Sequence, residues 1–186
     1  MEANAEKFFL DKVLVSDIMD KRLLDVGSRL IDYTLRPLIM SWYYPKEYIG
    51  IDIIGGTYVD KICAAEDIVA SFGENSFDFV MCVEAMEHVE KWKEAISNFK
   101  RCCKPGGIIL ITTRRPGWMK HDYPSDWWRY TISDFEKIFS DCKILSIEMD
   151  SFLPYTIDRK GVFVKVMKPM DFIEKDLSGY ELARVE

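Results

Sequence analysis

The residue types best suited to chemistry stand where two short, buried strands of the sequence are expected to end. Residues 23–28, LLDVGS, predict a strand that runs into a glycine turn, and Gly27 would let a ligand approach the backbone closely. Asp52 ends the next strand, 25 positions after Gly27, close to the roughly 20 positions expected in a nucleoside-binding unit. A carboxylate at this place can accept hydrogen bonds from both hydroxyls of a ribose. Each segment alone also fits an ordinary strand end, so the prediction of a nucleoside site depends on the pair.

Acidic residues and a histidine follow the next two predicted strands. Glu66 and Asp67 lie in a loop that reaches the same sheet edge, where a carboxylate could accept a hydrogen bond from an adenine amino group. Solvated loop charges are the alternative for both. Glu84, Glu87 and His88 come directly after residues 77–83, and Glu84 and His88 share one face if that segment is helical. We expect His88 to hold a hydrogen bond beside a bound ligand rather than to perform acid–base chemistry.

A long aromatic segment, residues 116–130, contains three of the five tryptophans and His121, one of the two histidines. Long loops at the ligand-binding edge of a sheet are often lids or pocket walls. We therefore expect this loop to line the pocket, and a purely structural loop pinned by stacked aromatic rings is the alternative.

The elements that must position these residues alternate between short β-rich runs and helical stretches, which predicts a mainly parallel sheet covered by helices. Ser133 and Glu136 form a capping-box pattern, so a helix should begin at Ser133 and end near residue 140. The last two strands are joined by only about a dozen residues without a helix, so they should be antiparallel. The expected strands are 22–26, 47–51, 58–63, 77–83, 108–112, 143–149 and 162–167. The expected helices are 4–19 and 91–103, with a mixed segment at 33–42 that Pro37 interrupts.

The composition indicates one soluble domain over residues 1–186, with an N-terminal helix within 1–20 and a weakly patterned tail at 169–186. The formal net charge of −6 disfavours binding of long nucleic acid. No apolar run is long enough for a membrane helix, and the N-terminus has no signal core. Five cysteines without a Cys-x-x-Cys pair favour a reducing, cytoplasmic location, and two histidines leave little for a histidine-based metal site.

The motif order LLDVGS, YIGID, AAED, FDFVMCVEAMEHVE and FKRCCKPGGIILIT resembles the class I S-adenosylmethionine-dependent methyltransferases over about residues 20–150. The segment HDYPSDWWRYT is similar to a loop found in one subgroup of that family. The resemblance implies an α/β, Rossmann-like sheet of seven strands with helices on both faces. Its strand order would be 3-2-1-4-5-7-6, with six strands parallel and one antiparallel, in agreement with the final antiparallel pair.

The resemblance also implies a set of residues that bind S-adenosylmethionine. The methionine part would lie beside Asp25, Gly27 and Ser28, the ribose on Asp52, and the adenine near Glu66 or Asp67. The full set of expected cofactor-binding residues is Asp25, Gly27, Ser28, Arg29, Asp52, Ile53, Ala65, Glu66, Asp67, Cys82, Val83, Glu84 and His88. The sequence departs from the family pattern because only Gly27 remains of the usual two or three glycines, and Ala64 stands where an aspartate is common.

Methyl transfer is an in-line displacement in which the protein orients the reactants and excludes water. His121 is the expected general base for an alcohol or amine acceptor, because an imidazole has an ordinary pKa of about 6.5. The acceptor pocket would be shaped by Tyr123, Asp126, Trp128 and Arg129. No metal is expected, so a chelator should leave activity unchanged.

Three other functions fit parts of the pattern. A degenerate domain could bind a partner and methylate nothing, as the thinned glycine turn suggests. A nicotinamide-dependent oxidoreductase would need glycines where Arg29 and Asp32 stand. Metal-assisted methyl transfer is a further variant. A small-molecule acceptor is expected, while a sugar or lipid-like hydroxyl and a protein side chain stay open, and a local basic rim of Arg114, Arg115, Lys120 and Arg129 is set against solvated loop charge.

Overall fold

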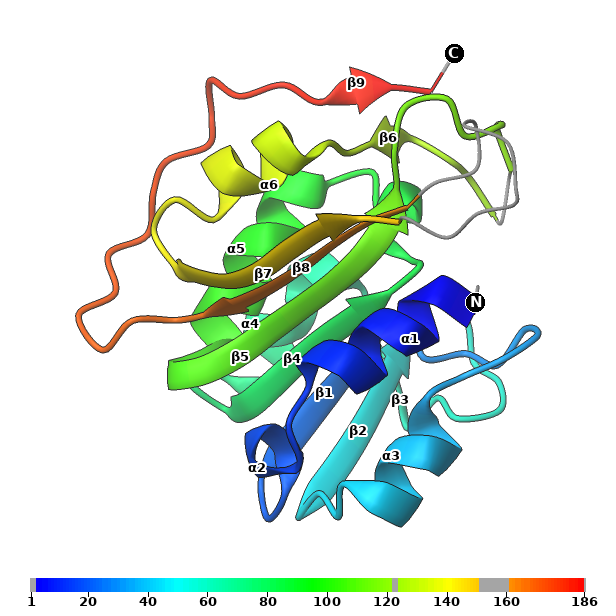
Figure 1. The fold of residues 1–186 in the computed structure, drawn as a ribbon, viewed down its shortest axis with the longest axis vertical. Helices are drawn as coiled ribbons and strands as arrows, with labels where there is room; N and C mark the ends of the chain where they lie inside the picture. Colours follow the sequence, from blue (N-terminus) through cyan, green and yellow to red (C-terminus); the bar gives the residue numbers. More distant parts are fainter. Residues whose placement is uncertain (1–2, 122–123, 151–160, 186) are drawn as a thin grey trace.

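The computed structural model describes residues 3–121, 124–150 and 161–185. Its centre is a seven-stranded sheet with the order β3-β2-β1-β4-β5-β8-β7 (Figure 1). Only β8 runs antiparallel to its neighbours β5 and β7. These strands are β1 (Arg22–Val26), β2 (Glu47–Asp52), β3 (Lys61–Ile62), β4 (Phe77–Val83), β5 (Cys103–Arg114), β7 (Lys143–Met149) and β8 (Gly161–Met167). The expected fold class, strand order and final antiparallel pair are therefore confirmed.

Helices cover both faces of the sheet (Figure 1). On one face lie α1 (Ala3–Lys12), α2 (Val15–Ile18) and α3 (Arg36–Trp42), and on the other lie α4 (Ile68–Phe72), α5 (Trp92–Cys102) and α6 (Ile132–Ile138). Successive β4 residues serve opposite faces, because Phe79 packs with Phe9 of α1 whereas Val80 packs with Phe99 of α5. The continuous apolar run of β4 follows from this double cover. None of these helices is long and apolar enough to cross a membrane.

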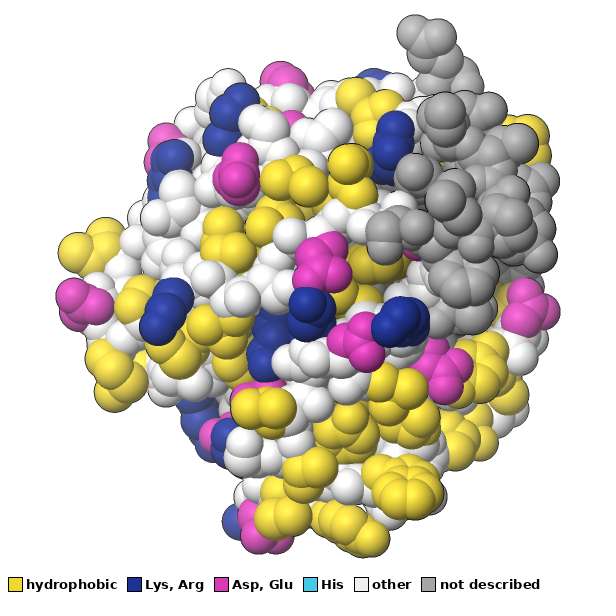
Figure 2. Space-filling view, viewed as in Figure 1, with side chains coloured by type: hydrophobic (Ala, Val, Ile, Leu, Met, Phe, Trp, Pro, Cys, Tyr) yellow, Lys and Arg dark blue, Asp and Glu magenta, His cyan; other side chains and the backbone are white. Residues whose placement is uncertain are grey.

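The first helical segment differs from the expected single helix over residues 4–19. It is broken at Leu14, whose extended backbone caps α2 while its N–H donates to the Asp17 carboxylate. Pro37 lies in the first turn of α3, which begins at Arg36, and does not interrupt the helix, because a proline there lacks only an N–H that would have no partner. Figure 2 shows hydrophobic side chains gathered over the lower part of this face. Trp42 of α3 and the nearby Tyr44 are exposed.

Two further boundaries differ from the expectation. The cap of α6 is Thr131, whose hydroxyl accepts the N–H of Asp134 while the Asp134 carboxylate accepts the N–H of Thr131. The expected box at Ser133 was therefore two residues late. The third strand is only two residues long, whereas β5 extends beyond both expected ends.

The C-terminal tail forms a small second sheet that the sequence pattern did not predict. Its strand β9 (Ala183–Arg184) pairs antiparallel with β6 (Trp128–Arg129), which belongs to the aromatic loop after β5. The two short strands lie side by side above the main sheet (Figure 1). The tail thus returns to the side of the molecule that carries the aromatic loop.

Candidate functional site

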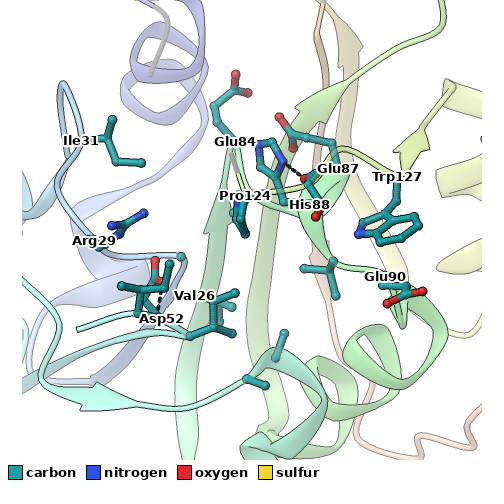
Figure 3. Close-up of a pocket in the computed structure, with 18 of the residues that line it drawn as sticks. Val26, Arg29, Ile31, Asp52, Glu84, Glu87, His88, Glu90, Pro124 and Trp127 are labelled. Carbon is teal, nitrogen blue, oxygen red and sulfur yellow. Dashed lines mark hydrogen bonds between the residues drawn. The ribbon is translucent and has the colours of Figure 1, made fainter. Parts of the chain in front are cut away.

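A cavity of about 650 Å³ opens at the edge of the sheet where the parallel strands end. Figure 3 shows Arg29 and Asp52 on one side, Trp127 and Glu90 on the other, and His88 with Glu87 between them. Ligand pockets in proteins commonly have volumes of roughly 300–1,000 Å³. The cavity is therefore large enough for a nucleoside-sized ligand with a second small molecule beside it.

The glycine turn after β1 closes one wall of this cavity. Gly27 has a backbone φ of +79°, and its N–H donates to the carbonyl of Ile51 at 2.9 Å. A Cβ at this position would lie 2.5 Å from the Cβ of Ala85, in the loop after β4. Both the backbone angle and the close approach demand glycine, so the one glycine that remains in the turn is the one that the packing requires.

Asp52 and Arg29 stand at the outer side of the cavity. One carboxylate oxygen of Asp52 accepts the backbone N–H of Ile54 at 2.9 Å, which fixes the side chain at the end of β2. The Arg29 side chain runs past Gly56, where an added Cβ would meet its Cγ and Cδ at 3.0 Å. Arg29 consequently lines the cavity wall and leaves the volume open, although its side chain stands where the family usually has glycine.

Glu84 marks the point where the chain leaves β4 for the cavity. Its φ of 55° is a left-handed conformation that costs energy for a residue with a side chain. The Glu84 N–H donates to the Thr112 carbonyl of β5 at 2.9 Å, and its carboxylate lies 2.6 Å from Nη2 of Arg114. Such strained positions cluster at functional sites because the surrounding structure holds a side chain where a ligand needs it.

The inner end of the cavity brings together Glu87 and His88, from a 3₁₀ turn (Met86–His88), and His121, from the aromatic loop. Oε2 of Glu87 accepts the hydroxyl of Thr113 at 2.8 Å, and its Oε1 lies 3.8 Å from Nε2 of His121. The two imidazole rings meet edge to face with centroids 4.9 Å apart. Nδ1 of His88 donates to the carbonyl of Ser125 at 2.5 Å.

The aromatic loop is held by a buried ion pair. Arg129 donates to both carboxylate oxygens of Asp126, at 2.5 and 2.7 Å, and also to the carbonyls of Trp118 and Met119. Burial raises the pKa of Asp126, but the hydrogen bonds from Arg129 and from the backbone of His121 outweigh it, so the pKa lies below its usual value. Asp126 also lies 3.0 Å from Nδ1 of His121. The pair thus fixes the loop and places the His121 imidazole beside Asp126.

The structure brings many of the expected site residues to the cavity and places the others elsewhere. The cavity is lined by Gly27, Arg29, Asp52, Ile53, Ala65, Glu66, Glu84, His88 and His121. Asp25, Ser28 and Val83 line a separate recess of about 30 Å³ beside Gly27, while Cys82 is buried in the core and Asp67 faces a different groove. Asp126, Trp128 and Arg129 are buried behind the cavity wall, and Tyr123 lies outside the described residues.

Several lining residues were not among the expected site residues. Trp127, Pro124 and Ser125 belong to the aromatic loop, but no pattern in the sequence distinguishes them from their neighbours. Arg114, expected in a basic rim, instead lies between Glu84 and Glu87, at 2.6 and 3.4 Å. Residues 88 and 121 are brought into contact although each histidine looked isolated in the sequence.

The cavity lining is strongly acidic. Its six carboxylates outnumber two guanidiniums, which gives a formal charge of −4 with the histidines neutral, and Glu87 is almost completely buried among them. The carboxylates belong to Asp32, Asp52, Glu66, Glu84, Glu87 and Glu90. A cavity of this charge favours a ligand that carries positive charge.

Comparisons with known proteins agree with this geometry. A family model described as a methyltransferase domain matches residues 3–141. An uncharacterised protein of Methanocaldococcus jannaschii is 28% identical over 125 residues, which cover 63% of this chain and 54% of that protein, so the match spans about half of the relative's length.

Two solved structures have the same fold at low sequence identity. An S-adenosylmethionine-dependent methyltransferase from Mesorhizobium loti has a TM-score of 0.67 and 13% identity, covering 89% of this chain and 98% of that one. The 1,6-didemethyltoxoflavin-N1-methyltransferase of Burkholderia thailandensis, solved with 1,6-didemethyltoxoflavin and S-adenosylhomocysteine, has a TM-score of 0.66 and 11% identity over 90% and 79% of the two chains. With a family model that matches well over half of its residues, the chain belongs to the methyltransferase domain family.

Proposed function

We propose that this protein transfers a methyl group from S-adenosylmethionine to a small-molecule acceptor bound at the inner end of the cavity. The observation that carries the proposal is the acidic cavity at the strand ends, with Gly27 and Asp52 at one side and the Glu87–His88–His121 group at the other. When bound, S-adenosylmethionine supplies a methyl group on a positively charged sulfur; the lone pair of the acceptor forms the new bond to carbon, and the electrons of the broken bond stay on sulfur.

The residues of the outer side fit that cofactor. Asp52 is fixed by its bond to Ile54 and would accept the hydroxyls of the ribose. Ala65 and Glu66, in a 3₁₀ turn (Ala65–Asp67), would lie near the adenine. The carboxylates that line the cavity would stabilise the positive charges of the cofactor, and the Gly27 turn would leave room for its methionine part.

The acceptor would bind beside the Glu87–His88–His121 group, enclosed by Pro124 and Trp127 of the aromatic loop. An alcohol or amine must lose a proton when its lone pair attacks carbon. We propose that a side chain of the Glu87–His88–His121 group accepts that proton. His121, which the sequence indicated as the base, has its backbone N–H held by Asp126 at 2.9 Å, and Nδ1 of its ring lies 3.0 Å from the same carboxylate. Asp126 and Arg129 would act on the acceptor only through the loop that they hold.

Calorimetry with S-adenosylhomocysteine tests cofactor binding. We expect micromolar binding to the wild type and a loss of roughly tenfold to a hundredfold in affinity for Asp52→Asn, because a charge-assisted hydrogen bond contributes about 1.5–3 kcal/mol. Asp67→Asn removes the same charge outside the cavity and should leave affinity unchanged. A wild type that binds nothing would refute the proposal and favour a non-catalytic scaffold.

Methyl transfer itself is tested with labelled S-adenosylmethionine and a fractionated cell extract. We expect label in a small-molecule fraction, with Asp52→Asn showing a higher KM for the cofactor. Label that appears only in protein or nucleic acid would contradict the acceptor class while leaving the reaction intact.

A further inference from the structure

We propose that Glu87, His88 and His121 bind a divalent first-row transition metal ion at the inner end of the cavity. Each of the three side chains offers one donor atom, and the three donor atoms lie within 4.8 Å of one another. Metal–nitrogen and metal–oxygen bonds of about 2.0–2.2 Å require donors roughly 3–4 Å apart. Shifts of about 1 Å would therefore close the site around an ion.

The His88 imidazole is oriented as metal ligands usually are, and the His121 imidazole faces Glu87. Nδ1 of His88 must carry its proton, because it donates to the carbonyl of Ser125, so the lone pair is on Nε2. Nδ1 of His121 lies 3.0 Å from a carboxylate oxygen of Asp126, and Nε2 of the same ring faces Glu87. The carbonyl of Ser125 behind the His88 ring fixes the orientation of that ring and raises the basicity of its other nitrogen. Nδ1 of His121 makes no hydrogen bond with any residue that the structure describes; Asp126 instead accepts the backbone N–H of His121 at 2.9 Å.

Glu87 supplies an independent observation that points to a cation. Its side chain is 1% exposed, and Oε2 is satisfied by Thr113. Oε1 is buried and accepts no hydrogen bond from any residue that the structure describes. Nε of Arg114 forms an ion pair with Oε1 at 3.4 Å, and the same guanidinium also pairs with Glu84 at 2.6 Å. A buried carboxylate oxygen in this situation is stabilised by a bound cation.

Two imidazoles and one carboxylate favour zinc, manganese, iron, cobalt or nickel over magnesium or calcium, which prefer oxygen donors. Three protein ligands leave coordination positions open toward the cavity. An oxygen atom of the acceptor could occupy one of them, and the ion would lower the pKa of that hydroxyl so that its proton passes to solvent. This last step rests on the proposed function; the binding of the ion does not.

The inference reverses the expectation that the protein needs no metal. That expectation depended on there being only two histidines and no clustered set of ligands in the sequence, whereas the fold brings both histidines together with Glu87. It also changes the role of His121, because a lone pair engaged with an ion cannot accept a proton from the acceptor. A chelator should then lower activity instead of leaving it unchanged.

Cobalt(II) titration tests the site directly. The full chain, prepared without a polyhistidine tag, is treated with a chelator, dialysed and titrated with cobalt(II), followed by calorimetry and visible absorption. We expect one equivalent to bind with d–d bands typical of nitrogen and oxygen donors. A thiolate charge-transfer band, which would place the ion on a cysteine, or no binding at all would overturn the proposal.

Matched variants locate the ion within the cavity. Glu87→Gln keeps the size of the side chain, and we expect it and His121→Ala to weaken cobalt binding at least tenfold. Glu90→Gln changes the same charge in the same cavity outside the cluster and should bind as the wild type does. Unchanged affinity in both cluster variants would refute the site.

Binding of S-adenosylhomocysteine to the metal-free wild type separates the two proposals. If the nucleoside binds and cobalt does not, only the metal site fails; if cobalt binds and the nucleoside does not, only the methyltransferase function fails. Thermal unfolding of Glu87→Gln and His121→Ala checks that both variants are folded.

Discussion

Asp25 gives the stability of this protein a pH dependence that can be worked out from the structure. Its carboxyl is 4% exposed near the end of β1 and accepts the hydroxyl of Tyr48 at 2.6 Å. Burial raises the pKa of Asp25 from 3.8 to about 7, although the hydrogen bond from Tyr48 and the charge of Arg36 act against that rise. The folded state therefore holds this proton more tightly than the unfolded chain does.

The sign of the effect follows from proton linkage. Below pH 3.8 the carboxyl is protonated in both states, and the stability that it contributes is fully present. As the pH rises, the unfolded chain ionises first, so the free energy of unfolding falls by up to about 1.4 kcal/mol per pH unit until the folded group ionises near pH 7. Between pH 5 and pH 7 the loss from this one group is about 2 kcal/mol.

Asp25→Asn removes the titrating group and keeps an oxygen for the Tyr48 hydroxyl. Urea unfolding at pH 5, 6 and 7 should show the variant gaining about 2 kcal/mol on the wild type across that range. Asp11→Asn, at an exposed position, corrects for the change in net charge. Tyr48→Phe removes a donor that lowers the pKa of Asp25. The free energy of unfolding of this variant should therefore keep falling to a higher pH than that of the wild type. Parallel curves for the wild type and Asp25→Asn would refute the reasoning.

Three further predictions concern other parts of the molecule. Lys100→Met should lower the free energy of unfolding by about 3 kcal/mol in urea, because it leaves the Asp141 carboxylate buried without the ammonium that lies 2.7 Å away; an unchanged midpoint would contradict this. Tyr44 has a φ of 48° and an exposed side chain. The free energy of unfolding of Tyr44→Gly should therefore exceed that of Tyr44→Ala by about 1 kcal/mol, which thermal unfolding would show as a higher midpoint for the glycine variant. Burial raises the pKa of the thiols of Cys102 and Cys142 to about 12, so a thiol reagent at pH 8 should label both slowly until the chain is unfolded, as mass spectrometry would show.

The sheet could be predicted from the sequence because its signals are local. The apolar run of β4 depends on a few neighbouring residues, and the strand order followed from a resemblance carried by such local motifs. Gly27 and Asp52 could also be predicted from the sequence, because both stand at the ends of strands, and both line the cavity.

The inner end of the cavity could not be predicted in the same way. The contact between His88 and His121 depends on how the aromatic loop folds back over β5, and that path is set by the Asp126–Arg129 pair. In the sequence Arg129 and Trp128 were expected to shape the pocket because they belong to the long aromatic loop at the ligand-binding edge. Their burial behind the wall depends on β9, whose residues give no strand pattern of their own.

The small sheet of β6 and β9 connects the tail to the inner end of the cavity through backbone hydrogen bonds. Val185 donates its N–H to the carbonyl of Trp127 at 3.0 Å, and Trp127 donates its own to the carbonyl of Glu87 at 2.9 Å. A fusion partner or affinity tag joined directly after β9 would disturb these two hydrogen bonds, and cleavage of the tail before β9 would remove the bond between Val185 and Trp127. Preparations tagged at opposite ends should therefore differ in ligand affinity even though both are well folded.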